Sequence, residues 1–286
     1  TGALRWRHDS HNRNDLRYSD GVSRGVSLWV DSSAAPGAVC RARIYAPTLD
    51  GRLLALDAAT GKPCQDFGRG GVIDLRQGVR SIDHRAVSGW SDYLVTSPPA
   101  ILDDEVIVGS SIGDNRAVSS ELGIVRAFDA RTGRLIWSWD PIPRHPSNPV
   151  YGQWSPQGAQ VTGAANAWAP LSVDAARHLV FVPTGSASPD YYGGERPGDD
   201  RWADSVVALD GDTGKLDWGR QLVHHDLWDY DAASQPTLVD LLHDGRYVPA
   251  VIQAQRSGPN PWREWGLALA GLLLGAVFTT WRVARQ

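Results

Sequence analysis

GIVRAFDARTGRLIW, residues 123–137, decides the fold because close copies of it recur along the chain. The copies are DGRLLALDAATGK at 50–62 and DSVVALDGDTGKLDW at 204–218, and TGALRW at 1–6 matches the end of another. Apolar and polar residues alternate before each Asp, a period of two that predicts half-buried strands. The glycine of the following Thr-Gly pair can take the positive φ of a tight turn. The sequence therefore predicts an all-β fold built from repeated antiparallel sheets.

Tryptophan is unusually frequent, with 13 among 286 residues. Trp6, Trp137 and Trp218 each stand four residues after the glycine of a Thr-Gly pair, whereas Gln65 takes that place in the copy at 50–62. A large ring at the same point of successive repeats indicates that one packing role is repeated with them.

Composition and cysteine content limit the partners and the compartment. A net charge of −4 gives no electrostatic reason to expect a nucleic-acid partner. Cys40 and Cys64 flank a hairpin signal at Asp50-Gly51, so they are placed to face each other across paired strands. Two interpretations stay open, a disulfide formed in an oxidising compartment or two buried free thiols.

The composition changes after residue 258. Residues 266–281 carry no charge and have tryptophans at both ends, although they are shorter than the roughly 20 residues of a typical spanning helix. We expect repeats over 1–258, a linker over 259–265 and a transmembrane helix over 266–282. A buried core helix or an unrelated tail is the alternative. Arginines beyond the helix would place its end in the cytoplasm and the repeats outside the inner membrane.

The stretch HHDLWDYD at 224–231 combines three carboxylates, two imidazoles and two large aromatic residues, which indicates a site. It resembles the H-D-x-W-D-x-D segment that supplies the catalytic aspartate of quinoprotein dehydrogenases, which use pyrroloquinoline quinone (PQQ). The repeats resemble the tryptophan-docking motif of the same enzymes. Over residues 1–258 the chain is similar to their membrane-bound glucose, quinate, shikimate and polyol group. Since that family's propeller has eight blades, the resemblance implies a partial β-propeller with about half of them, truncated at both ends.

The resemblance also implies a catalytic base and a metal site. Asp229 matches the catalytic aspartate, and the competing interpretation is a carboxylate that caps a turn. GSSIGDNR at 109–116 resembles the family's loop near cofactor and metal, which makes Asp114 and Asn115 candidates for both. The metal ligands expected are Asp114, Asn115 and Asp229, and the ion is Ca²⁺ or Mg²⁺, because both prefer oxygen ligands.

Three further residues match positions at the PQQ cofactor. Trp168 lies in NAWAP at 166–170 and would stack on the flat quinone, with structural packing as the competing interpretation. Arg24, in SRGVSLW, matches an arginine suited to a carboxylate of PQQ. Arg256 stands where the sugar dehydrogenases of the group have a lysine. Asp20 replaces a histidine of the glucose enzymes and would repel an anionic cofactor unless Arg24 or the metal intervenes.

The resemblance implies oxidation of a small alcohol or sugar by hydride transfer to PQQ. Electrons would pass to membrane ubiquinone, and the catalytic domain would face the periplasm from the bacterial inner membrane. Two other hypotheses stay open: a non-catalytic propeller scaffold that binds proteins, and an inactive remnant of such an enzyme. Asp190 and Ser188, in TGSASPDYYGG at 184–194, are further candidates from a loop that resembles an active-site loop of the group.

Overall fold

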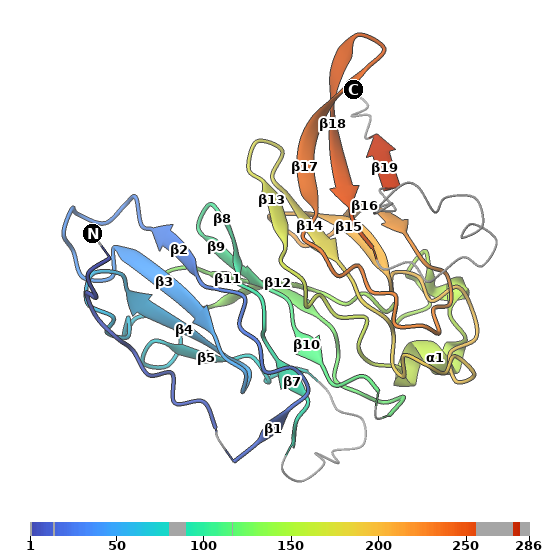
Figure 1. The fold of residues 1–286 in the computed structure, drawn as a ribbon, viewed down its shortest axis with the longest axis horizontal. Helices are drawn as coiled ribbons and strands as arrows, with labels where there is room; N and C mark the ends of the chain where they lie inside the picture. The colour runs from blue at the N-terminus through green and yellow to red at the C-terminus, as the bar shows by residue number, and fades with distance from the viewer. Residues whose placement is uncertain (1, 14, 80–89, 116, 256–276, 281–286) are drawn as a thin grey trace.

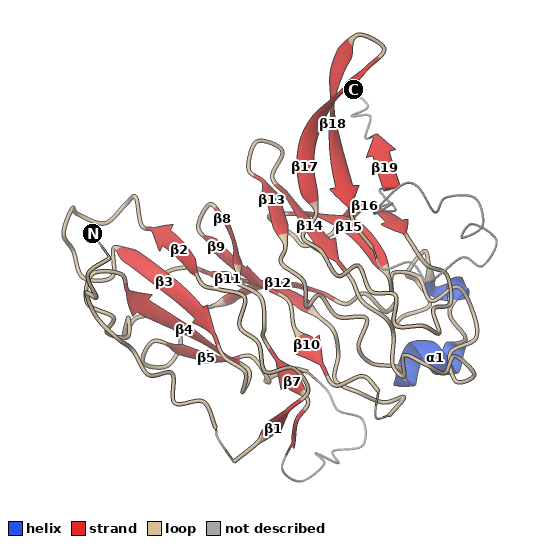
Figure 2. Ribbon diagram, in the orientation of Figure 1, coloured by secondary structure: helices blue, strands red, loops and turns tan. Residues whose placement is uncertain are grey.

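The chain is built almost entirely of β-strands (Figure 2). The structure, a computed structural model, describes residues 2–13, 15–79, 90–115, 117–255 and 277–280. Most strands belong to antiparallel sheets of three or four strands, and strands that follow one another in a sheet are also neighbours in the chain, except that β10 lies between β9 and β11.

Three complete four-stranded sheets and one three-stranded sheet follow one another in chain order. The strands of the first are β2 (Ser27–Val30), β3 (Ala42–Pro47), β4 (Arg52–Asp57) and β5 (Val72–Asp74). Those of the second are β8 (Ala100–Leu102), β9 (Glu105–Val108), β11 (Val125–Asp129) and β12 (Leu135–Trp139). The third holds β13 (Ser172–Asp174), β14 (Leu179–Pro183), β15 (Ser205–Asp210) and β16 (Leu216–Gln221), and the fourth β17 (Thr237–His243), β18 (Arg246–Gln253) and β19 (Val277–Thr280).

The sheets stand side by side along an open arc (Figure 1), and their first strands, β2, β8, β13 and β17, contact one another in sequence. Since each sheet is a blade whose first strand lies on the inside of the arc, the arrangement is the all-β partial propeller predicted from the repeats.

Short elements lie outside the main sheets, before the first blade and in the connecting segments. β1 (Arg17–Tyr18) pairs in parallel with β6 (Trp90–Ser91), and β7 (Tyr93–Leu94) pairs with β10 (Ser111–Ile112). The connection that ends at β13 contains the 3₁₀ turn η1 (Tyr151–Gln153) and the helix α1 (Pro156–Val161). Ser155 caps α1, since its hydroxyl oxygen accepts a hydrogen bond from the amide nitrogen of Gly158 at 3.0 Å.

The repeated aspartate and Thr-Gly pair form one turn that recurs in each copy. In the third blade, Asp210 Oδ1 accepts hydrogen bonds from the amide nitrogen and the hydroxyl of Thr213, at 2.9 and 2.6 Å. Trp137 of the second blade lies on this turn, so that a Cβ added at Gly214 would lie 2.4 Å from its Cε3 atom. Its indole nitrogen donates to the carbonyl oxygen of Gly211 at 2.7 Å. Ring and turn therefore join neighbouring blades.

The same junction forms at the first blade and is altered at the second. Trp6 covers Gly61 and donates to the carbonyl oxygen of Ala58 at 3.0 Å. At Gly133 the place of the ring is taken by Ile73, whose Cδ1 atom would lie 2.8 Å from an added Cβ. The departure at Gln65 is thus compensated by an aliphatic side chain from β5 of the same blade.

The central strands are buried on both faces, so the half-buried pattern predicted for them is wrong. Every residue of β4 from Leu53 onward is buried, as are Val125 to Phe128 of β11. Two apolar clusters explain this result. One cluster joins the first and second blades around Tyr45 and Phe128. The other cluster joins the second and third blades around Val125 and Val207. β11, in the second blade, thus packs against a neighbouring blade on each side and has no face left for solvent.

The expected transmembrane helix over 266–282 does not form over residues 277–280, which are strand β19, paired with β18 from Ala250 to Gln253. Val277, Phe278 and the two threonines after them favour a strand, because β-branched and aromatic side chains fit a pleated sheet. The rest of the predicted helix, and the linker, lie outside the described residues. Within those ranges, no helix is both long and apolar enough to cross a membrane.

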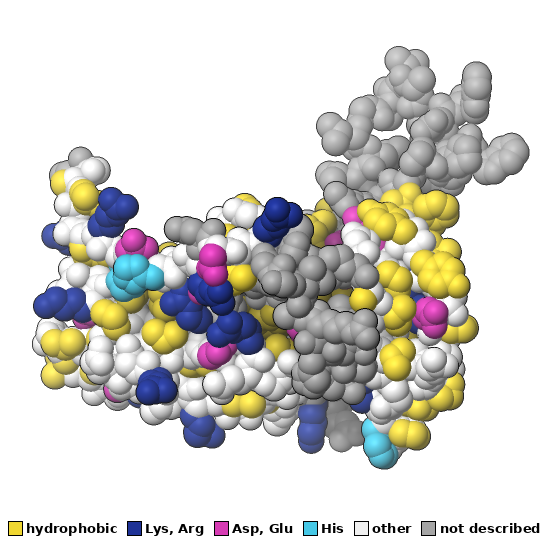
Figure 3. Space-filling view, turned by 90° about the horizontal axis from the view of Figure 1, so that it is seen from below, with side chains coloured by type: hydrophobic (Ala, Val, Ile, Leu, Met, Phe, Trp, Pro, Cys, Tyr) yellow, Lys and Arg dark blue, Asp and Glu magenta, His cyan; other side chains and the backbone are white. Residues whose placement is uncertain are grey.

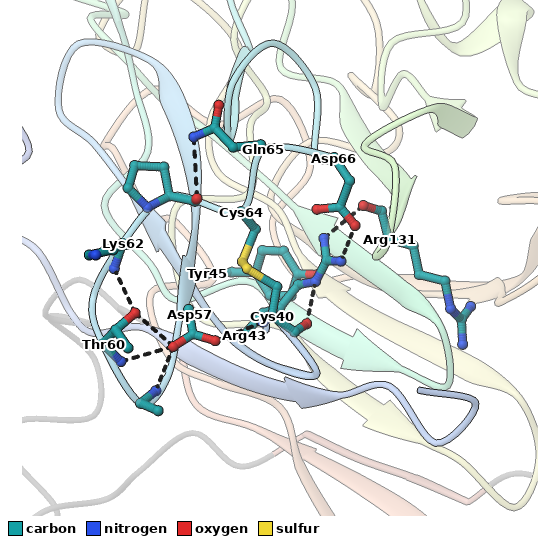
Figure 4. The surroundings of a disulfide bond; sticks show 12 residues. Cys40, Arg43, Tyr45, Asp57, Thr60, Lys62, Cys64, Gln65, Asp66 and Arg131 are labelled. Carbon is teal, nitrogen blue, oxygen red and sulfur yellow. Dashed lines mark hydrogen bonds and ion pairs between the residues drawn. A yellow bond between two sulfur atoms is a disulfide. The ribbon is translucent and has the colours of Figure 1, made fainter. Parts of the chain in front are cut away.

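Cys40 and Cys64 form a disulfide, with their Cα atoms 5.7 Å apart. The bond lies in the first blade (Figure 4), where the amide nitrogen of Cys40 donates to Asp57 Oδ2 at 2.7 Å. Beside it, the buried guanidinium of Arg43 pairs with Asp66 at 2.5 Å. The disulfide thus ties the start of β3 to the segment that follows the first Thr-Gly turn.

Charged groups of both signs are mixed on the face of the molecule seen in Figure 3, where arginines lie next to acidic side chains. Among the ion pairs of the described residues, Arg131 contacts both Asp31 and Asp104, with nitrogen to oxygen distances of 2.9 and 2.8 Å. The mixture agrees with the small net charge of the chain.

Candidate functional site

A cavity of about 410 Å³ opens at one edge of the blades. Its lining comprises Ser19, Asp20, Arg24, Ser111, Ile112, Gly113, Asp114, Asn115, Trp168, Asp190, Asp229 and Asp231. Six of these positions were predicted from the sequence as site residues: Arg24, Asp114, Asn115, Trp168, Asp190 and Asp229.

Blade topology explains why residues so far apart in the chain meet here. Arg24 and Trp168 precede the first strands of two blades, β2 and β13. Asp190 follows a second strand, β14, and Asp229 follows a fourth strand, β16. Because neighbouring strands of an antiparallel sheet run in opposite directions, the first strand starts at the same end of the sheet at which the second and fourth strands finish. The connections at this edge therefore bring their side chains to one place.

Arg24 and Trp168 form one wall of the cavity. The guanidinium carbon of Arg24 lies 4.9 Å from the centre of the Trp168 ring, within the range of a cation–π contact. The same guanidinium lies 3.4 Å from Asp20 Oδ2. The arginine thus stands between Asp20 and the indole, in agreement with the expectation that Arg24 could offset the charge of that acid.

Asp231 fixes the indole nitrogen of Trp168, whose ring contacts Arg24. Its Oδ2 atom accepts a hydrogen bond from the indole nitrogen at 2.7 Å, and its Oδ1 atom accepts one from the amide nitrogen of Ser186 at 2.6 Å. A side chain at Gly185 would collide with this carboxylate, since an added Cβ would lie 2.6 Å from Oδ1. Asp231 had no role in the sequence-based prediction, although its place two residues after Asp229 was a signal that could have suggested one.

Asp114 and Asp190 both line the cavity, close enough for the carboxyl group of each to shift the pKa of the other. Burial raises the pKa of Asp114 to about 7, and the charge of Asp231 adds to the shift. Burial raises the pKa of Asp190 to about 9, with a further contribution from the charge of Asp114. The Oδ1 atom of Asp190 is buried without a hydrogen-bond partner in the described part of the chain. The negative charges of these neighbouring carboxylates therefore repel one another, and a bound cation would stabilise their ionised forms.

Asp229 lies on a tight turn that Asp226 organises. Its own backbone has a φ of +59°, and its Oδ2 atom accepts a hydrogen bond from the Tyr191 hydroxyl at 3.3 Å. On either side of it, the amide nitrogens of Trp228 and Tyr230 donate to the Asp226 carboxylate at 3.2 and 2.8 Å. The turn presents Asp229 to the cavity, and its role as catalytic base stays a prediction.

Asn115 and Arg256 complete the set of predicted site residues. Asn115 lines the cavity and is otherwise exposed to solvent. Arg256 lies outside the described residues, so its predicted contact with the quinone stays a prediction.

The cavity fits the cofactor and the cation that the resemblance implies. A planar ring and a guanidinium on one wall suit a flat, anionic quinone. Of the lining residues given above, five are aspartates and one is arginine, an oxygen-rich set that suits Ca²⁺ or Mg²⁺. In the described ranges, no three His, Cys, Asp or Glu side chains are arranged to hold a metal ion unaided. Further oxygen ligands, from Asn115, the cofactor or water, would have to complete the coordination.

Comparison with known proteins gives concordant matches. The family model for the β-propeller domain of PQQ-dependent glucose, ethanol and alcohol dehydrogenases matches residues 1–259. The chain is 38% identical over 273 residues to the quinoprotein glucose dehydrogenase of Gluconobacter oxydans (strain 621H), covering 90% of this chain and 32% of that protein. It is 40% identical over 229 residues to the quinate/shikimate dehydrogenase (quinone) of Acinetobacter baylyi, covering 79% of this chain and 27% of the relative.

Among solved structures, the chain resembles the quinohemoprotein alcohol dehydrogenase of Comamonas testosteroni. The TM-score is 0.66 at 29% sequence identity, and the match covers 84% of this chain and 33% of the other. The chain thus spans about a third of the length of the proteins that it matches.

Proposed function

Because the chain belongs to the β-propeller family of PQQ-dependent glucose, ethanol and alcohol dehydrogenases, we propose that it forms the cofactor-binding part of an enzyme that oxidises an alcohol or a sugar. The observation that carries the proposal is the single cavity that brings together Arg24, Asp114, Trp168 and Asp229. A non-catalytic scaffold would have no physical need for five aspartates around a guanidinium and an indole ring.

Each side chain has a task that follows from its surroundings. The Trp168 ring, fixed by its hydrogen bond to Asp231, offers a flat apolar surface, and Arg24 offers two parallel donors to a carboxylate. Asp114, Asn115 and Asp229 would hold the divalent ion. When bound, PQQ supplies the carbonyl carbon that accepts a hydride, and the ion polarises that carbonyl.

Asp229 accepts the proton of the substrate hydroxyl. A general base must reach that proton, and Asp229 is the carboxylate that a turn projects into the cavity beside the Tyr191 hydroxyl. Asp114 and Asp190 are less suited to this task at neutral pH, because burial raises the pKa values of both carboxyl groups and so favours their protonated forms.

The proposal extends to the substrate class and the electron acceptor. The relatives are named for glucose and for quinate or shikimate, and one name includes a quinone as acceptor. We therefore propose a sugar, a cyclic polyol or a small alcohol as substrate and membrane ubiquinone as acceptor. Reduction of a ubiquinone analogue by the PQQ-loaded chain tests the second point.

We also propose that the chain works at the bacterial inner membrane, with its blades in the periplasm. The Cys40–Cys64 disulfide supports an oxidising compartment. The charge-free run at 266–281 supports attachment to a membrane. Fractionation of cells that express the chain with and without residues 266–276, which precede β19, tests this, since only the longer form should sediment with membranes.

Cofactor retention tests the central proposal. The purified chain is incubated with PQQ and Ca²⁺ and passed over a gel filtration column, and the absorbance of the quinone is followed. We expect it to elute with the wild-type chain and to be lost with Trp168→Ala. A folded but colourless wild-type chain would support a scaffold instead, and an aggregate would support an inactive remnant.

A further inference from the structure

Arg196 is the largest fully buried side chain of the described structure, with 0% of its surface exposed. Such burial is rare for a charged residue unless partners satisfy it. Its guanidinium forms an ion pair with Asp200. It also donates to the carbonyl oxygens of Asp226 at 2.6 Å and Pro189 at 3.3 Å.

These carbonyl groups belong to two different loops, and each loop carries an aspartate into the cavity. Pro189 directly precedes Asp190. Asp226 begins the turn that presents Asp229, and its carboxylate accepts the amide hydrogen bonds on both sides of that residue. One planar group therefore joins the backbone beside Asp190 to the backbone that carries Asp229.

Asp200, the ionic partner of Arg196, contacts the second loop as well. Its Oδ2 atom lies 3.2 Å from His225 Nδ1, and the same ring nitrogen lies 2.9 Å from the carbonyl oxygen of Gly198. Burial raises the pKa of Asp200 to about 6, although Arg196 and His225 oppose the shift. A buried ion pair of this kind adds little net stability, because removing both charges from water offsets their attraction. The presence of the Arg196–Asp200 ion pair is better explained by the two loops that it holds together than by a gain in stability.

We propose that Arg196 is a positioning residue that fixes the separation of the loops that carry Asp190 and Asp229, and with it the place of Asp229 among the proposed ligands of a divalent cation. Arg196 does not line the cavity and acts only through the two loop backbones. The metal-binding part of this inference rests on the function proposed above. Lysine cannot replace the arginine, because a single ammonium group lacks the planar fork that reaches two carbonyl groups and a carboxylate together.

Arg43 provides a matched control. It is also a buried arginine, 3% exposed, with an ionic partner, Asp66, and with hydrogen bonds to the carbonyl oxygens of Cys40 and Arg131 at 3.0 and 2.7 Å. Figure 4 shows this group beside the disulfide, and none of its partners lines the cavity. Arg43→Lys therefore makes the same chemical change at a buried guanidinium group whose partners are not among the proposed metal ligands.

The experiment compares the wild type, Arg196→Lys and Arg43→Lys by two measurements on the whole chain. Isothermal titration with Ca²⁺ gives the affinity, which we expect to fall about 10- to 100-fold in Arg196→Lys, as for the loss of other groups that orient metal ligands. We expect it to stay within about twofold of wild type in Arg43→Lys. Hydrogen exchange of the metal-free proteins should rise in peptides covering 189–200 and 224–231 in Arg196→Lys alone. Arg196→Gln repeats both measurements in case the lysine finds a new partner.

The outcomes separate this inference from the proposed function. Wild-type affinity in both Arg196 variants, or an equal loss in Arg43→Lys, would overturn the positioning role. A wild-type chain that binds no Ca²⁺ would refute the proposed metal site. In that case hydrogen exchange decides the role of Arg196 by itself, since unchanged exchange in the two loops would show that it does not hold them.

Discussion

The contact between Trp137 and Gly214 should contribute measurably to the stability of the propeller, and Gly214→Ala tests it. Gly214 has a φ of +66°, and an added Cβ would lie 2.4 Å from Trp137 Cε3. The indole cannot easily withdraw, because it is buried and its nitrogen donates to Gly211. The substitution therefore combines backbone strain with overpacking.

A second glycine separates these two effects. Gly245, in the exposed β17–β18 turn, has a φ of +74° and no atom within 4 Å of an added Cβ. Alanine at positive φ costs about 1–2 kcal/mol, so Gly245→Ala should lower the free energy of unfolding by that amount. Overpacking costs a further 1–3 kcal/mol or so, which brings Gly214→Ala to about 2–5 kcal/mol.

Urea unfolding followed by circular dichroism measures both free energies. We expect Gly214→Ala to be the more destabilising by about 1–3 kcal/mol. In the background of Trp137→Ala, which removes the ring, the two alanine substitutions should cost the same. Equal costs in the presence of Trp137 would refute the docking contact as a source of stability.

Three further predictions concern the disulfide and the cavity. Replacing Cys40 and Cys64 together by serine should lower the free energy of unfolding by about 3 kcal/mol, given the loop that the bond closes, and urea unfolding with and without a reductant checks this. The raised pKa values of Asp114 and Asp190 mean that the folded chain holds protons more tightly than the unfolded chain, so its stability should fall as the pH rises from about 4 to 9. Because Ca²⁺ competes with those protons, the rise in melting temperature that it causes should be larger at pH 8 than at pH 5.5, and an equal rise at both would contradict the assignment. Asp229→Asn should lower turnover of an artificial dye by the PQQ-loaded chain by about 10²- to 10⁴-fold, and wild-type turnover would exclude it as the base.

The repeated parts of the fold were predictable from the sequence, and their local exceptions were not. The Asp and Thr-Gly pattern predicts each blade turn, because the hydrogen bonds that it forms are local. Ile73 takes the place of a docking ring at Gly133, and nothing in its sequence context indicates this role. The burial of β11 on both faces depends on contacts with neighbouring blades, and the pattern of residues within one strand cannot predict those contacts.

The candidate site was predicted where a motif marks it and missed where only the fold creates it. Arg24, Trp168 and Asp229 stand in segments with a recognisable pattern, and the structure brings them to one cavity. Asp231 gains its role from the Trp168 indole and from Ser186, which are remote in the chain. Arg196 lies in a loop without regular structure, so its burial becomes visible only when the two loops are seen together.

The C-terminal run shows the limit of hydropathy as a guide. Residues 266–281 carry no charge, a pattern that favours a helix, yet 277–280 pair with β18. Composition does not distinguish an apolar helix from an apolar strand when a sheet edge is available to pair with it.

Equilibrium dialysis of PQQ against the purified chain tests most directly whether the cavity is a cofactor site. With Ca²⁺ present we expect one PQQ per chain, release of that PQQ when a chelator removes the ion, and loss of binding in both Arg24→Ala and Asp114→Ala. Binding that ignores the chelator and both substitutions, or no binding by the wild type, would contradict the account.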